Sequence, residues 1–215
     1  MSATQDRDRV ARIATADVAA ASRIARNISD PWFRCQALAS VAWRVDAEKP
    51  FFGIIDESLE SGWSIKIPNR AATVVAWPVA ALAGHSLSGP GARERTRSMF
   101  RAALDQVRKV VAEDLSPISR ADALLIHVHA LSPSCPELRK GIIDLLMKEC
   151  RDPANRKRQR QIEEAALVIA RDDPGTALTL ASSLDESRRR RTVASIEQKN
   201  VVLGPRSFFE GTRPR

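Results

Sequence analysis

The chain has 215 residues, a formal net charge of +8 at pH 7 and 44% hydrophobic residues. Because 28% of the residues are charged and the hydrophobic share is ordinary, the composition excludes an intrinsically disordered chain. Only 5% of the residues are aromatic and tyrosine is absent, which favours helices packed through aliphatic side chains over a β-sandwich or barrel. The positive charge would draw the chain weakly to any polyanion without selecting one.

Apolar residues early in the chain recur every three or four positions, the spacing of one face of an α-helix. From Val10 to Ile28 this spacing predicts a single helix, which ends before Pro31. Because proline suits the first turn of a helix, a second helix should begin there and fold back on the first as a helical hairpin. Pro78 lacks a backbone donor and should kink or split a later helix. The helices expected in this part are residues 10–28, 31–45, 51–62 and 70–83.

A loop rich in glycine and proline follows at 86–91, and any subdomain boundary is expected at 85–92. Turns that contain proline or aspartate then separate six further helical stretches. These are residues 93–115, 119–131, 137–150, 155–171, 175–184 and 187–198. The sequence thus predicts an all-α, single helical-repeat domain of about ten helices over residues 1–199, followed by an irregular C-terminal tail at 200–215.

Two distant stretches of the sequence resemble each other, which favours stacked repeats over a simple bundle. The first runs Ile24-Ala25, Ile28, Asp30, Arg34 and Leu38-Ala39-Ser40-Val41, and the second runs Leu180-Ala181, Leu184, Asp185, Arg189 and Val193-Ala194-Ser195-Ile196. A weaker copy consists of Leu115, Ser116, Pro117, Arg120, Ala123 and Leu124. Each copy would be a pair of short helices that buries its apolar face only when another pair stacks on it.

On the residues Ile24-Ala25, Ile28, Asp30-Pro31, Arg34 and Ala37-Leu38, the chain resembles the bacterial α-helical repeat proteins of the HEAT-like and tetratricopeptide-like (TPR-like) α-solenoid class. The resemblance implies stacked antiparallel helical hairpins in a right-handed superhelix, with a concave surface for binding. It carries over no catalytic residue.

Two groups of cations stand near the expected starts of helices in the C-terminal part. They are Arg156, Lys157, Arg158 and Arg160, and Arg188, Arg189, Arg190 and Arg191. Cations at an exposed helix N-terminus are disfavoured by about 0.3 to 1 kcal/mol each, so a site for an anion is one interpretation. A solvated charged face paired with acidic turns is the other. If the helices stack as repeats, both groups would line one edge.

The first functional hypothesis is a non-enzymatic scaffold that mediates protein–protein interaction, with a basic edge facing an acidic partner. The alternative is binding of the nucleic-acid phosphate backbone without sequence preference. Aromatic residues are not interleaved with the cations, which disfavours stacking of unpaired bases.

An enzyme is the third hypothesis, and the sequence offers little for it. His127 and His129 are two positions apart on an expected helix and would project to different faces. The sequence shows no phosphate-binding glycine loop, no nucleophile elbow and no metal-binding group of cysteines and histidines. No catalytic residue, cofactor or metal is therefore expected.

The cysteines and the N-terminal sequence indicate the cellular compartment of the protein, and the C-terminal phenylalanines indicate a contact of the tail. Cys35, Cys135 and Cys150 have neither disulfide-framework nor zinc spacing, which indicates a reducing compartment. No secretory signal and no run of the about 20 apolar residues needed to cross a membrane are recognised, so a cytoplasmic protein is expected. Phe208 and Phe209 should cap the last repeat or occupy a groove of a partner.

Overall fold

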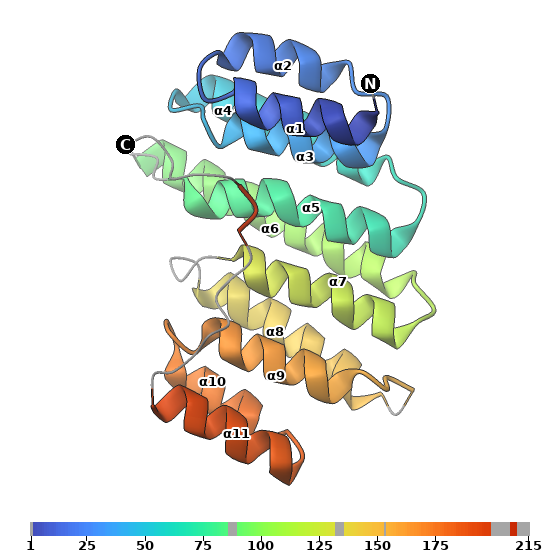
Figure 1. Ribbon diagram of the computed structural model, residues 1–215, viewed down its shortest axis with the longest axis vertical. Coiled ribbons are helices and arrows are strands. Elements are labelled where there is room, and N and C mark those ends of the chain that lie inside the picture. Colours follow the sequence, from blue (N-terminus) through green and yellow to red (C-terminus); the bar gives the residue numbers. More distant parts are fainter. Residues whose placement is uncertain (1, 86–89, 132–135, 153, 199–206, 210–215) are drawn as a thin grey trace. The chain divides into compact units, whose positions relative to one another are not determined.

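The computed structural model describes residues 2–85, 90–131, 136–152, 154–198 and 207–209, which form eleven α-helices and no strand (Figure 1). The predicted all-α fold of about ten helices is confirmed, whereas the right-handed superhelix stays a prediction. Contacts group the chain into two compact units: unit 1 is residues 1–110 with 207–215, and unit 2 is residues 111–206. The predicted boundary segment 85–92 includes residues 86–89, which lie outside the described residues. Within the described ranges no helix is long and apolar enough to cross a membrane.

Unit 1 is built from two layers of helices. Helices α1, α3 and α5 pack side by side, while α2 packs on α1 and α3, and α4 packs on α3 and α5. Phe51 and Phe52 are fully buried, and Phe52 also lies under the guanidinium of Arg95 from α6 at 4.4 Å. The helices are α1 (Ala3–Ile13), α2 (Val18–Arg26), α3 (Pro31–Ala42), α4 (Glu48–Trp63), α5 (Pro68–Gly84) and α6 (Pro90–Ala112), the last of which continues into unit 2.

The single helix predicted for residues 10–28 is wrong, because α1 and α2 are separate helices. The carboxylate of Asp17 accepts a hydrogen bond from the backbone N–H of Ala20 at 2.8 Å and so begins a new helix. Ala14 and Val18 are four positions apart across this turn, so the apolar spacing continues while the backbone does not. Periodicity alone therefore could not reveal the break.

Helix α5 is not split at Pro78, contrary to one of the two predicted outcomes. Proline has no N–H, so the carbonyl of Val74, four positions earlier, loses its usual partner within the helix. The buried thiol of Cys35 in α3 donates to this carbonyl instead, with a sulfur–oxygen distance of 3.7 Å. Burial raises the pKa of Cys35 to about 12, so the thiol keeps its proton at neutral pH and remains a donor.

Unit 2 repeats the two-layer arrangement. Helices α7, α9 and α11 form one layer, while α8 packs on α7 and α9, and α10 packs on α9 and α11. The helices are α7 (Pro117–Ala130), α8 (Pro136–Arg151), α9 (Arg158–Ile169), α10 (Pro174–Ala181) and α11 (Glu186–Glu197). The start predicted at Asn155 is wrong, because Arg156 lies in the turn that precedes α9 and Lys157 is the cap residue of that helix.

The two phenylalanines of the tail pack on tryptophans of unit 1. The ring of Phe209 stacks on Trp43 with centroids 4.8 Å apart and meets Trp77 edge-on at 5.6 Å. Phe208 meets Trp77 edge-on at 5.6 Å as well. The prediction that these residues cap the last repeat is therefore wrong, because the aromatic surface that receives them belongs to α5 and to the end of α3. Residues 200–206 and 210–215 lie outside the described residues.

Replacing Phe209 by alanine is expected to lower the free energy of unfolding by about 2 kcal/mol, since two aromatic contacts and their buried area are lost. Urea unfolding followed by tryptophan fluorescence measures this, because all four tryptophans belong to unit 1. Ile67, which is 50% exposed and also belongs to unit 1, is the control, and its replacement by alanine should cost less. Equal stabilities of the two variants would show that Phe209 does not hold this position in solution.

Candidate functional site

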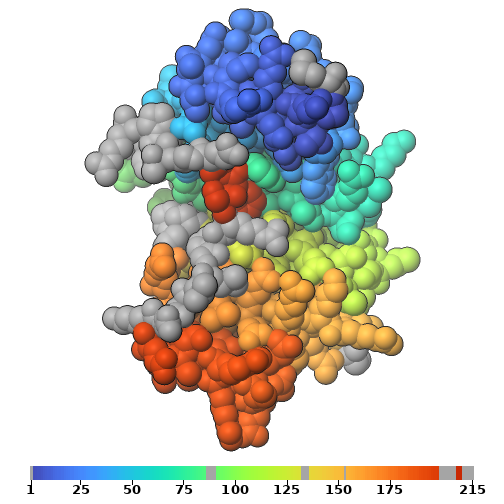
Figure 2. All heavy atoms as spheres, viewed as in Figure 1, coloured from blue at the N-terminus to red at the C-terminus, as the bar shows by residue number. Residues whose placement is uncertain are grey.

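The two groups of cations lie at or near the N-terminal ends of two neighbouring helices of unit 2, α9 and α11. The backbone N–H of Asp185, which caps α11, donates to the side-chain oxygen of Gln159 in the first turn of α9 at 2.8 Å. The N-terminal ends of α9 and α11 are therefore neighbours, and the surfaces of the two helices adjoin in Figure 2, where α9 is orange and α11 is orange-red at the bottom of the view. We name this surface the basic edge. It consists of Arg156, Lys157, Arg158, Arg160, Arg188, Arg189, Arg190 and Arg191.

Half of these cations have carboxylate partners. Glu163 of α9 pairs with both Arg188 and Arg191, the latter at 3.8 Å, so it also ties α11 to α9. The other pairs are Arg188 with Asp185 at 3.5 Å, Arg190 with Glu186, and Lys157 with Asp122 at 3.5 Å. For these residues the structure matches the interpretation of a charged face paired with acidic neighbours.

The remaining four are Arg156, Arg158, Arg160 and Arg189, which we name the unpaired arginines. No carboxylate among the described residues lies within ion-pair distance of their side chains. Three of them are exposed and Arg158 is half-buried. No side chain caps the N-terminus of α9, so the partial positive charge of that helix end adds to the charge of the arginines. Helix N-termini and guanidinium groups together suit a carboxylate or a phosphate.

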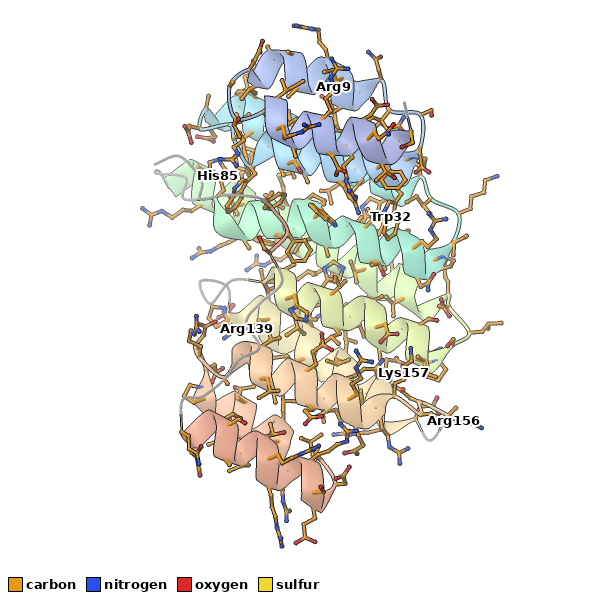
Figure 3. The ribbon with its side chains drawn as sticks, in the orientation of Figure 1. Arg9, Trp32, His85, Arg139, Arg156 and Lys157 are labelled. Atoms are coloured by element: carbon orange, nitrogen blue, oxygen red, sulfur yellow. The ribbon has the colours of Figure 1, made fainter. Side chains whose placement is uncertain are left out.

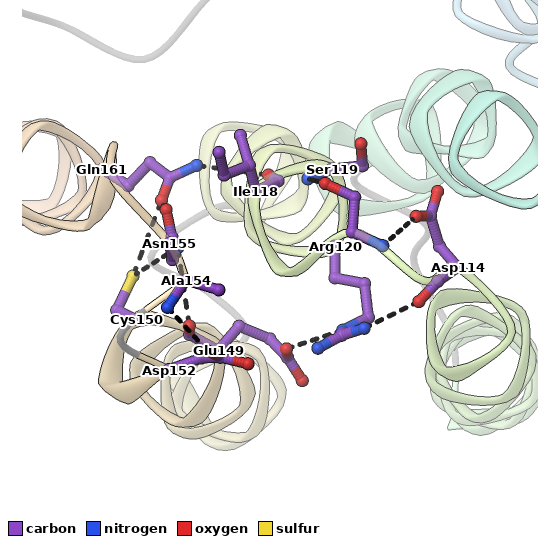
Figure 4. Close-up of polar contacts among 11 residues, drawn as sticks. Asp114, Ile118, Ser119, Arg120, Glu149, Cys150, Asp152, Ala154, Asn155 and Gln161 are labelled. Carbon is purple, nitrogen blue, oxygen red and sulfur yellow. Dashed lines mark hydrogen bonds and ion pairs between the residues drawn. The ribbon is translucent and has the colours of Figure 1, made fainter.

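A buried amide pair fixes the turn that carries Arg156 and Lys157 (Figures 3 and 4). Asn155 is fully buried, its side-chain nitrogen donates to Gln161 at 2.8 Å, and its oxygen accepts from the backbone N–H of Lys157 at 3.1 Å. Gln161 in turn donates to Asp122 at 2.6 Å and to the carbonyl of Ile118 at 3.3 Å. The first turns of α7 and α9 therefore lie side by side, and these buried hydrogen bonds hold the turn before α9 in place.

Sequence reasoning missed Asn155 and Gln161. The available signal was an asparagine directly before a basic stretch, a residue type whose side chain commonly bonds to the backbone two positions later. The partner Gln161 could not be found this way, because its contacts depend on how α7 and α9 pack.

A second polar contact holds the hairpin of α7 and α8. Arg120, in the first turn of α7, donates to Glu149 in the last turn of α8 at 2.7 Å and to the carbonyl of Asp114 at 2.7 Å (Figure 4). The start of one helix meets the end of the next, so the hairpin is antiparallel, as predicted. The side chains of Arg120 and Glu149 are only 19% and 16% exposed, which limits screening by solvent.

A groove of about 780 Å³ separates α8 from α10 on the opposite layer of unit 2. Arg139, labelled in Figure 3, is 4% exposed and pairs with Asp172 at 3.5 Å and with Asp173 at 3.9 Å. Hydrogen bonds from the backbone N–H and the hydroxyl of Thr176 lower the pKa of Asp173, which therefore stays charged. The cations that line the groove, Arg139, Lys140 and Arg151, are balanced by Glu137, Asp144 and Asp173. The groove thus has no charge preference for a ligand.

Groups able to do chemistry are held in structural contacts. His129 is 6% exposed, and its Nε2 lies 3.0 Å from a carboxylate oxygen of Glu164. Burial, with the nearby Glu149 and Asp122, raises the pKa of Cys150 to about 12, so at neutral pH this residue is a thiol and a poor nucleophile. Within the described ranges no group of three or more His, Cys, Asp or Glu side chains could hold a metal ion, while Cys135 lies outside them.

The basic edge therefore combines a turn held by buried hydrogen bonds with four arginines that have no carboxylate partner among the described residues. No protein-family model, curated protein or solved structure matches this chain. Guanidinium groups beside an uncapped helix N-terminus are the kind of groups that suit a carboxylate or a phosphate.

Proposed function

We propose that this protein is a non-enzymatic helical-repeat scaffold, HEAT-like or TPR-like, whose basic edge binds an acidic segment of a protein partner. The unpaired arginines carry this proposal, because four arginines in or just before the first turns of two neighbouring helices have no carboxylate partner among the described residues. In the free protein, the arginines are repelled by the partial positive charge of the helix N-terminus, and a bound carboxylate would offset this repulsion. Each guanidinium can also form two parallel hydrogen bonds to a carboxylate.

A carboxylate-bearing partner is favoured over nucleic acid by the distribution of aromatic residues. The 4 tryptophans and 6 phenylalanines all lie outside residues 111–206 and tyrosine is absent, so unit 2 offers no phenylalanine, tyrosine or tryptophan ring on which a base could stack. Contact with the phosphate backbone of a duplex is the alternative, since it requires only cations and exposed helix ends.

A polyglutamate peptide tests the proposal by fluorescence anisotropy at physiological ionic strength. Changing the four unpaired arginines to glutamine is expected to weaken binding by at least about tenfold. A charge-assisted hydrogen bond contributes about 1.5 to 3 kcal/mol when it is shielded from water, and solvent lowers this contribution at an exposed edge. The matched control removes the same charge from Arg9, Arg23, Arg93 and Arg101, which are exposed in unit 1. Equal losses in the two quadruple variants would mean that net charge, and not the basic edge, binds the peptide.

Duplex DNA is the second ligand in the same titration. A phosphate binder loses affinity steeply as salt is added, with a slope set by the number of contacts. Tighter binding of DNA than of the peptide at physiological salt, lost in the basic-edge variant but not in the control, would make the alternative the function.

A further inference from the structure

An arginine at one position recurs in helices of both units and closes a hairpin in each. Arg34 follows the cap residue of α3 by four positions, and it donates to the carbonyl of Ile28 at 3.3 Å and to the hydroxyl of Ser61, near the end of α4, at 2.9 Å. Arg120 holds the same position in α7 and makes the same two kinds of contact, to the carbonyl of Asp114 and to Glu149 near the end of α8. In both hairpins the arginine joins the preceding turn to the second helix.

Arg189 occupies this position in α11, four residues after its cap Asp185. Its side chain is exposed, and no described residue provides it with an acceptor like Ser61 or Glu149. One turn further on, Val193 is partly exposed, although Leu38 and Leu124, the residues at the matching positions of α3 and α7, are each 1% exposed. The face of α11 that bears Arg189 and Val193 therefore corresponds to the face that α3 and α7 bury.

We propose that this face of α11 receives an acidic amphipathic helix from the protein partner, which completes the hairpin as α8 completes that of α7. A carboxylate of the incoming helix takes the place beside Arg189 that Glu149 takes beside Arg120, and an apolar residue covers Val193. This inference rests on the proposed function. It adds that the partner segment is helical and that Arg189 is the residue that recognises its carboxylate.

Charge argues for an acidic helix and against a second copy of this chain. Helix α11 contains four arginines, Arg188 to Arg191, and two glutamates, Glu186 and Glu197. Two copies meeting through this face would bring like charges together, which is unfavourable. An acidic helix brings the opposite charge to these arginines, which favours its association with this face.

The test uses a synthetic peptide that carries glutamate and leucine one turn apart along one face of a helix. Its control is a diastereomer with several D-residues, which has the same composition and charge but cannot form the helix. Binding to the full chain is measured by anisotropy, and the helical peptide is expected to bind at least about tenfold more tightly than the diastereomer. Equal affinities would overturn the inference.

Variants of the chain locate the contact. R189Q is expected to weaken binding of the helical peptide about tenfold, whereas R160Q, which removes the same charge from α9, should weaken it only two- to threefold. R189K keeps the charge without the planar fork and should fall between R189Q and the unaltered chain. R189E should regain affinity for a peptide in which lysine replaces the glutamate. Equal losses for R189Q and R160Q would contradict the assignment of Arg189.

Polyglutamate separates failure of this inference from failure of the proposed function. If the chain binds polyglutamate but does not prefer the helical peptide, the proposed function of the basic edge is retained and only the docking of a helix on α11 is wrong. If the chain binds neither, both proposals fall. A peptide-free dimer in sedimentation that R189Q dissociates would also overturn the inference, because the occupant of the face would then be a second copy.

Discussion

Replacing Gly62 by leucine is expected to lower the free energy of unfolding by about 3 kcal/mol, since extra atoms in a packed core force neighbouring helices apart. A Cβ atom at this position would lie 2.6 Å from a methyl carbon of Val75, 3.2 Å from the sulfur of Cys35 and 3.3 Å from a methyl carbon of Val74. Real Cβ atoms do not approach other atoms as closely as the first of these distances. Helix α4 could therefore keep its place on α3 and α5 only if those helices moved.

Gly53 provides the matched control on the same helix. Nothing lies within 4 Å of a Cβ atom built there. Leucine at position 53 is expected to raise the free energy of unfolding by about 0.5 to 1 kcal/mol, because glycine is a poor residue for a helix interior. Urea unfolding followed by tryptophan fluorescence compares the two variants. If both replacements had the same effect, the close approach of α4 to α5 would be refuted.

Replacing Gln161 by leucine is expected to lower the free energy of unfolding of unit 2 by about 3 kcal/mol, because the change leaves several buried polar groups without partners. Gln161 is 2% exposed and contacts Asn155, Asp122 and the carbonyl of Ile118. Leucine fills a similar volume but offers none of these groups a hydrogen bond. The loss therefore reports the polar contacts more than the packing.

A double-mutant cycle with Asn155→Leu isolates the amide–amide hydrogen bond. When both partners become apolar, neither side-chain amide is left facing an apolar replacement of the other, so the double variant should be more stable than the sum of the single losses by about 1 to 2 kcal/mol. Thermal unfolding followed by circular dichroism is the suitable measurement, because unit 2 contains no tryptophan. Strictly additive losses would show that Asn155 and Gln161 do not interact in solution.

The same variants bear on the basic edge. Asn155 accepts from the backbone of Lys157 and so sets the course of the chain through Arg156. Asn155→Leu should thus weaken binding of polyglutamate even under conditions in which the variant remains folded, although it removes no charge. This behaviour would distinguish a preformed site from a loose collection of cations.

The helical class and several helix starts could be read from the sequence because their causes are local. Apolar residues at three- and four-residue spacing predicted the helices, and Asp30 followed by Pro31 predicted the start of α3, where Asp30 caps the N–H of Trp32 at 2.8 Å. The presence of two cation groups at neighbouring helix ends also followed from repeats of similar length. These signals act within one turn or two of the chain, so neighbouring residues suffice to reveal them.

The ion pairs and contacts between residues far apart in the sequence were decided by the packing of the helices, and local sequence patterns do not reveal them. Arg188 is neutralised by Glu163, 25 positions away, and Gln161 meets Ile118 across 43 positions. The tail residue Phe209 stacks on Trp43, far earlier in the chain. Which of eight similar cations stay unpaired thus depends on which carboxylates adjoining helices bring within reach. Charge pairing and close packing are properties of atoms in contact, and the order of residues along a chain does not state which distant atoms will touch.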